Sequence, residues 1–149
     1  MGFNRVAIGC DHGGFALKGI VCKTLKKRGI KVLDFGTNNA VSVDYPYYGY
    51  SVAKAIIEED ADSGILICGT GIGISIAANR YPQVRAAVVC DAESAKLCRQ
   101  HNNANVLCLG GRTTSPSAAK LCLEIFLDTE FDADGRHERR VKMLSKPNF

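Results

Sequence analysis

Residues 64–74 read GILICGTGIGI. The apolar run at the start is short and continuous, which is typical of a strand covered on both faces within a parallel sheet. Three glycines follow at every second position, and the segment ISIAANRY (74–81) after them is a helix candidate that Pro82 ends. This order of strand, glycine turn and helix is the repeating unit of an α/β fold.

The same alternation runs through the rest of the chain. Helix-length segments separate five β-rich runs, so the sequence predicts a parallel sheet with helices on both faces and right-handed crossovers. The tail, residues 131–149, is polar and basic and has room for one more short helix. The expected strands are 6–10, 31–36, 64–69, 85–90 and 105–110, and the expected helices are 15–29, 48–60, 74–81, 92–102 and 115–129.

Capping residues mark several of the expected helix ends. Asp91 and Ser115 stand where a side-chain oxygen can cap a helix N-terminus, and Pro116 follows at the first helical position. The first expected helix ends in Lys-Lys-Arg-Gly (26–29), a favourable C-terminal sequence. These signals support the boundaries drawn from the apolar pattern.

Length and composition favour one globular domain spanning residues 1–149. The chain is 46% hydrophobic and 23% charged, and it shows no internal repeat or linker. No apolar run is long enough to cross a membrane, and the N-terminal sequence lacks the features of a signal peptide. We therefore expect a cytoplasmic protein with no membrane partner.

The net charge of +4 is mild, and much of the basic excess lies in the tail. Aromatic residues make up only 7% of the chain and Trp is absent, whereas nucleic-acid binders usually interleave a broad basic field with aromatics. The charge pattern therefore argues against a nucleic-acid partner and fits a basic site for a small anion at least as well.

Seven cysteines are present, at positions 10, 22, 68, 90, 98, 108 and 122. No pair has C-x-x-C spacing, so the sequence suggests neither a zinc site nor a redox-active dithiol. Most of these thiols are expected to act as small hydrophobic residues in a reducing cytosol. Cys68 stands apart because it directly precedes the glycine turn.

The glycine turn has two competing interpretations. The first is a pyrophosphate site, with Asp91 lying 20 residues after Gly71; however, the third glycine arrives one residue early, so the dinucleotide fingerprint is broken. The second is a cradle for negative charge that develops on a small substrate. A thiol at Cys68, preceding a helix N-terminus, should be partly thiolate and able to move a proton, although a buried strand cysteine explains the residue equally well.

Further acid–base and anion-binding groups lie in the turns that follow other strands and in the tail. Ligands of open parallel sheets bind at the carboxyl ends of strands, which favours a role for Asp11 and His12 after the first strand. His101 precedes the fifth strand and Arg112 follows it. Arg136 and Arg140 would share one face of a helix, although a solvated basic tail explains them as well.

Five blocks of the sequence together resemble the ribose-5-phosphate isomerase B family, which also includes allose- and galactose-phosphate isomerases. In chain order they are GCDHGGFALK (9–18), VDYPYYG (43–49), GILICGTGIGISIAANR (64–80), RQHNNANVLCLGGR (99–112) and GRHERRV (135–141). The resemblance implies a Rossmann-like, three-layer α/β/α sandwich on a five-stranded parallel sheet. It also implies isomerisation of ribose 5-phosphate to ribulose 5-phosphate in the non-oxidative pentose phosphate pathway, with no metal or organic cofactor.

The resemblance also implies residue roles. Cys68 is similar to the base that moves a proton between C1 and C2, Thr70 to a residue of the enediolate cradle, and His101 to the ring-opening acid, with Asp11 as its partner. His137, between the two tail arginines, matches only weakly. Ile74 stands where another branch of the family has a catalytic glutamate, which places the chain in the cysteine branch. The expected substrate-binding set is Asp11, His12, Tyr45, Gly69, Thr70, Gly71, Ile72, Gly73, Asn102, Arg112, Arg136 and Arg140.

The same resemblance leaves two alternative functions open and implies an oligomeric state. The chain could instead isomerise a six-carbon sugar phosphate, such as allose or galactose 6-phosphate, or bind a phosphosugar without catalysis. Members of the family form dimers or dimers of dimers with sites built from two subunits. Because the phosphate ligands and Cys68 are far apart in sequence, we expect a homodimer or dimer of dimers in which the tail or the His101 turn reaches a neighbour's Cys68 loop.

Overall fold

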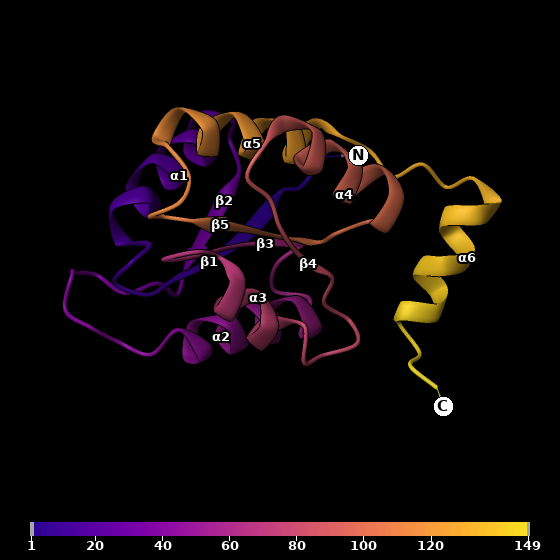
Figure 1. Cartoon of the computed structure of the whole chain (residues 1–149), viewed down its shortest axis with the longest axis horizontal. Coiled ribbons are helices and arrows are strands. Elements are labelled where there is room, and N and C mark those ends of the chain that lie inside the picture. The colour runs from indigo at the N-terminus through magenta and orange to yellow at the C-terminus, as the bar shows by residue number, and fades with distance from the viewer. Residues whose placement is uncertain (1, 149) are drawn as a thin grey trace.

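The computed structural model describes residues 2–148, and its centre is one sheet of five parallel strands (Figure 1). The order across the sheet is β2-β1-β3-β5-β4. This order places β3, the strand that carries Cys68, in the middle, between β1 and β5. The strands are β1 (Arg5–Cys10), β2 (Lys31–Asp34), β3 (Ser63–Cys68), β4 (Ala86–Val88) and β5 (Val106–Gly110).

The three central strands explain the continuous apolar runs of the sequence. Every residue of β3 and β5 is buried, and so is all of β1 after Arg5. The edge strands β2 and β4 are only partly covered and are shorter than expected, because pairing ends at Asp34 and Val88. Strands covered on both faces need no alternation of polar and apolar residues.

Helices cover both faces of the sheet (Figure 1). One apolar cluster joins the sheet to α1, α4 and α5, with Phe126 and Leu123 of α5 among its wholly buried side chains. A second cluster joins the other face to α2 and α3 through Val52 and Ile74. The predicted three-layer α/β/α sandwich is therefore confirmed. The helices are α1 (Phe15–Lys27), α2 (Tyr45–Ile57), α3 (Ile72–Ala78), α4 (Ala92–Asn102), α5 (Pro116–Asp128) and α6 (Gly135–Leu144).

Two helices begin earlier than the sequence suggested, and both differences affect the candidate site. Helix α2 starts at Tyr45, not at residue 48, because Pro46 sits in the first turn, where its missing N–H leaves no helical bond unmade. Helix α3 starts at Ile72, not at residue 74, so Gly73 belongs to the helix and only Gly71 takes a left-handed conformation, with φ of 77°.

The predicted helix caps are confirmed. Asp91 accepts a hydrogen bond from the Ser94 N–H and Ser115 accepts one from the Ala118 N–H. Gly29 follows α1 with φ of 72°, which suits a glycine just beyond a helix end. The expected short helix in the tail is α6, which stands beside the end of α4, away from the sheet (Figure 1).

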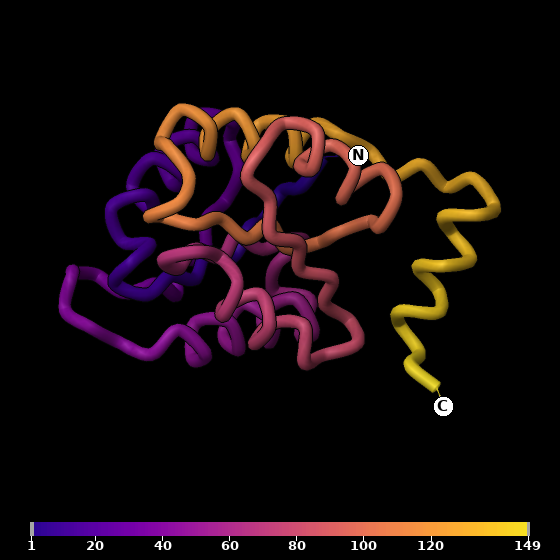
Figure 2. The backbone as a smooth tube through the Cα atoms, viewed as in Figure 1, coloured from indigo at the N-terminus to yellow at the C-terminus, as the bar shows by residue number. Residues whose placement is uncertain are grey.

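The long connection between β2 and α2 bulges out at the edge of the molecule, as the tube in Figure 2 shows. Its start is fixed by the buried Lys18, whose ammonium group pairs with Asp34 at 3.0 Å and donates to the Asn38 side chain at 3.3 Å. Thr37 donates its N–H to the Cys10 carbonyl. These contacts hold the connection against the end of β1. No helix among residues 2–148 has the length and apolar character needed to span a membrane.

Two glycines, Gly14 at the N-cap of α1 and Gly19 within the helix, provide a matched test of the packing. A Cβ atom at Gly14 would lie 2.4 Å from the Ile67 carbonyl oxygen, whereas one at Gly19 would meet nothing within 4 Å. We expect Gly14→Ala to lower the free energy of unfolding by at least about 2 kcal/mol, because backbone must move. Gly19→Ala should raise it by up to about 1 kcal/mol. Urea denaturation of both variants checks this; equal stability of the two would contradict the packing described.

Candidate active site

Three loops, which follow β1, β3 and β5, meet with almost no side chain between them, and together they form what we call the loop floor (residues 11–14, 69–73 and 110–114). A Cβ atom at Gly111 would lie 2.2 Å from the Gly13 carbonyl oxygen, and one at Gly13 would lie 2.9 Å from the Gly69 nitrogen. The Gly111 N–H donates to the Cys68 carbonyl at 2.8 Å. Glycine is therefore required where the loops touch.

Cys68 is the last residue of β3, and its thiol faces the turn that follows. The side chain is buried, and its Sγ accepts a hydrogen bond from the Gly71 N–H at 3.1 Å. Gly71, which donates this N–H, has a left-handed conformation with φ of 77° at the N-cap of α3. A main-chain donor aimed at sulfur stabilises negative charge on it, so the geometry suits a thiolate.

Five other cysteines are unsuited to act as a base at neutral pH. Burial raises the pKa of Cys10 and Cys98 to about 11 and raises that of Cys108 still further. Burial also raises the pKa of Cys22 and Cys122. They are the small core residues that the sequence suggested, and each stays protonated in the folded protein.

Thr70 and the amides after Cys68 are partly engaged with one another. The exposed Thr70 hydroxyl accepts a hydrogen bond from the Ile72 N–H at 3.2 Å, while the Gly71 N–H donates to the Cys68 sulfur. Two of the amides expected to cradle an enediolate therefore already have partners. The Thr70 hydroxyl can still donate its own proton to a ligand at the same position.

Asp11 and His12 reach the loop floor from β1. The buried Asp11 carboxylate accepts hydrogen bonds from the Gly13 N–H at 2.8 Å and the Gly14 N–H at 3.3 Å, which fixes its orientation. His12 Nδ1 accepts a hydrogen bond from the Val43 N–H at 3.2 Å. In the neutral ring the proton must then sit on Nε2, which makes that nitrogen a donor.

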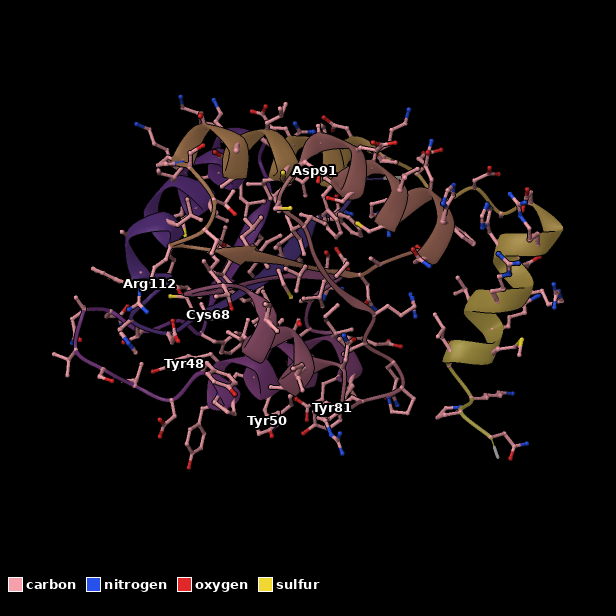
Figure 3. All side chains as sticks on the ribbon, in the orientation of Figure 1. Tyr48, Tyr50, Cys68, Tyr81, Asp91 and Arg112 are labelled. Atoms are coloured by element: carbon pink, nitrogen blue, oxygen red, sulfur yellow. The ribbon has the colours of Figure 1, made fainter. Side chains whose placement is uncertain are left out.

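Arg112 and Tyr45 border the same floor. The Arg112 guanidinium lies over Gly69, where a Cβ atom would be 3.3 Å from Nη1, and Figure 3 shows Arg112 and Cys68 at the same end of the sheet. The Tyr45 ring covers Gly73, where a Cβ atom would be 2.7 Å from Cζ. The structure thus brings together Cys68, Thr70, Asp11, His12, Tyr45, Arg112 and the glycine turn.

The remaining predicted residues lie at the opposite end of the sheet. Helix α4 runs back against the strands, so His101 and Asn102 at its end lie near Val106, where β5 begins. Cys68 pairs with Gly110, at the other end of β5, about 13 Å of strand away. Arg136 and Arg140 belong to α6, next to the end of α4 (Figure 1). One chain therefore does not unite the predicted site.

We call the residues at this end of the sheet (His101, Asn102, Arg136 and Arg140) the second group. His137 also belongs to it, and its contacts in the structure are better defined than its weak match to the family suggested. Its ring stacks on the ring of His101 with centroids 4.3 Å apart and planes 9° apart. Its Nε2 lies 3.4 Å from Nη2 of Arg136, and Asp134 accepts its N–H, which lowers the Asp134 pKa. The sequence offered a histidine between two arginines, but no pattern reveals a ring contact between residues 36 positions apart in the sequence.

A cavity of about 490 Å³ lies beside the second group, between the end of α3, β4 and the C-terminal residues. Asn102, Tyr81, Arg85, Leu144 and Pro147 are among its lining residues, which include no thiol, carboxylate or imidazole. Its size would suit a small ligand. Cys68, Asp11 and His12 do not line it, and they lie together at the loop floor instead.

One group among residues 2–148 has the composition of a metal site. Potential ligand atoms of Asp132, Asp134 and His137 lie within 4.8 Å of one another, and both carboxylates are exposed. Asp134 already caps α6, and the Arg136 guanidinium beside the His137 ring opposes a further cation. The group is explained by the start of α6 and lies far from Cys68.

Comparisons with known proteins identify the family of the chain. The model of the family described as Ribose/Galactose Isomerase matches residues 6–144. Ribose-5-phosphate isomerase B of Escherichia coli is 44% identical over 141 residues, which cover 95% of this chain and 94% of that protein.

Solved structures show the same fold throughout. Ribose-5-phosphate isomerase B of Clostridium thermocellum superposes with a TM-score of 0.93 at 46% identity, covering 95% of each chain. The enzyme of Thermotoga maritima superposes with a TM-score of 0.91 at 46% identity, covering 95% of this chain and 97% of the other. Sequence and overall fold thus agree over nearly the whole chain: it belongs to the ribose/galactose isomerase family.

Proposed function

We propose that this protein interconverts ribose 5-phosphate and ribulose 5-phosphate, with Cys68 as the base. The observation that carries the proposal is the hydrogen bond from the Gly71 N–H to the Cys68 sulfur, at the centre of a loop floor that also holds Asp11 and His12. The relatives named ribose-5-phosphate isomerase B support the choice of substrate.

The first chemical step opens the sugar ring. The bond between C1 and the ring oxygen O4 breaks, and O4 takes the electron pair together with a proton from His101. The anomeric hydroxyl loses its proton, with Asp11 as the acceptor, and C1=O1 forms. General acid–base help of this kind typically contributes about 10²–10⁴ in rate.

The second step moves a proton along the open chain. The Cys68 thiolate removes the proton from C2, and the electron pair passes to O1 to give an enediolate. The thiol then returns the proton to C1 while the O2 proton moves to O1, which leaves a ketone at C2. The Thr70 hydroxyl, which is exposed beside Cys68, donates to the charged oxygen.

Basic residues bind the phosphate and hold the reacting carbons in place. Arg112 and the Nε2–H of His12 stand at the loop floor, and Arg136 and Arg140 lie one helical turn apart on α6. Binding energy from the phosphate positions C1 and C2 against Cys68, which raises the rate of the chemical step. The reaction needs no metal or organic cofactor.

The complete site is built from two subunits. Within one chain the length of β5 separates the Cys68 floor from His101, Asn102, Arg136 and Arg140, so a second copy must supply the latter group. An exposed apolar surface on α2 and α3 supports such pairing: Tyr47, Ile72 and Ile76 are more than half exposed. A homodimer, or a dimer of dimers, would bring the two ends together.

Replacing the thiol tests the base directly. We expect Cys68→Ala to lose at least about 10³ of kcat on ribose 5-phosphate, because the proton acceptor is gone. Cys90→Ala is the matched control, since Cys90 also follows a strand but is exposed and away from the glycine turn. The assay follows ribulose 5-phosphate formation with EDTA present, and activity of the wild type should survive EDTA.

Three outcomes would contradict parts of this proposal. Full turnover by Cys68→Ala would exclude the thiol as the base. Loss of wild-type turnover in EDTA, restored by a divalent metal, would exclude the metal-free reaction. Turnover of allose or galactose 6-phosphate without turnover of ribose 5-phosphate would keep the mechanism and change the substrate, and phosphosugar binding without any turnover would leave a non-catalytic protein.

Mixing two inactive variants tests the shared site. Cys68→Ala lacks the base and His101→Ala lacks the ring-opening acid, so each alone should be nearly inactive. A mixed dimer contains one site with both groups intact, and unfolding and refolding the two together should restore a substantial fraction of wild-type turnover.

The same mixture also distinguishes the alternative. If each chain contained a complete site, every site in the mixed dimer would lack one group and turnover would stay at the level of the single variants. Sedimentation of the active fraction should show a dimer or tetramer, and a fully active monomer would rule out the shared site.

A further inference from the structure

Helix α6 is attached to the rest of the chain at its N-terminal end. Of its ten residues, His137 alone is buried, with 6% of its surface exposed. The segment before the helix is fixed as well, because the Asp132 N–H donates to the Gln100 carbonyl at 3.0 Å. Both attachments are made to the last turn of α4, at Gln100 and His101.

The ring of His101 is oriented by one contact. Among residues 2–148 no hydrogen bond or ion pair within the chain holds its side chain, and the stack with His137 at 4.3 Å is what restrains it. A half-buried imidazole with one covered face keeps a single ring plane, with its nitrogens directed along the edge of the stack. An unstacked ring at a helix end would instead sample several rotamers.

His137 is itself held on several sides. Asp134 accepts its main-chain N–H at 3.1 Å as the N-cap of α6, and the Arg136 guanidinium lies 3.4 Å from its Nε2. The carboxylates of Asp132 and Asp134 lie close to the same ring. The platform under His101 is therefore rigid, and it is tied to the helix that carries Arg136 and Arg140.

We propose that His137 is a positioning residue for ring opening: its ring holds His101 at the angle from which His101 protonates the ring oxygen of the sugar. This inference rests on the proposed function, because it assigns the proton donor to His101. The flat face of the ring does the positioning, so an aromatic side chain without nitrogens should replace it, while a branched aliphatic side chain of similar burial should not.

The two directions of the reaction separate this role from a merely structural one. Ribose 5-phosphate is mostly a furanose and must be opened, whereas ribulose 5-phosphate carries its phosphate on O5 and cannot close a furanose ring. In the reverse direction the open aldehyde can leave the enzyme and cyclise in solution. Because ring closure has this second route in solution, the reverse kcat depends much less than the forward kcat on the angle of His101.

The test compares initial rates in both directions for His137→Leu, His137→Phe and the wild type. We expect His137→Leu to lower the forward kcat about ten- to a hundredfold, the range for a displaced catalytic group, and to leave the reverse kcat near the wild-type value. His137→Phe should recover most of the forward rate. Met143→Ala, an exposed change on the same helix, should alter neither direction.

Other results overturn the inference. An equal fall of kcat in both directions would show that His137 supports the fold of the site as a whole. A rise of KM in both directions with kcat unchanged would show that it only places the phosphate-binding arginines. Wild-type rates in His137→Leu would show that His137 does not position His101. A wild-type protein inactive in both directions would instead refute the proposed function.

Discussion

Contact between bare backbones at the ends of β1, β3 and β5 is the constraint on which the site depends. Gly111 lies against the carbonyl of Gly13, and Gly14 lies against the carbonyl of Ile67, at separations that no Cβ atom could share. This close approach puts Asp11, Cys68 and Arg112 on one small surface although they come from three strands. Without it each strand would end in an independent loop, and these residues would not share one surface.

The direction in which the chain runs separates His101 and helix α6 from the loops at the strand ends. In a parallel sheet every helix returns the chain to the starting edge, so a residue at the end of a helix cannot reach the loops at the strand ends of its own chain. His101 is such a residue, and α6 continues from the same edge. Assembly of two copies is thus a chemical requirement of the proposed reaction, in addition to any contribution to stability.

Much of the fold could be predicted from the residues. Buried parallel strands have continuous apolar sequences, and a helix N-cap is a single polar residue at a recognisable place. Asp91 and Ser115 cap the helices that they were expected to cap. The expected start of α2, at residue 48, is too late because Pro46 lies inside the first turn of the helix, where a proline is tolerated. The His101–His137 stack had no signal in the sequence, since it depends on how α6 docks.

The hydrogen bond to the Cys68 sulfur comes from the main chain, and this has a consequence for how the protein tolerates sequence change. A side-chain donor disappears with one substitution, whereas the main-chain N–H at position 71 is present for every residue except proline. What a substitution can disturb is the left-handed conformation of residue 71, which costs an ordinary L-residue about 1 kcal/mol or more. Substitutions in this loop should therefore change the geometry of the hydrogen bond to the sulfur by small steps. Related sequences can vary around Cys68 without losing the donor in a single substitution.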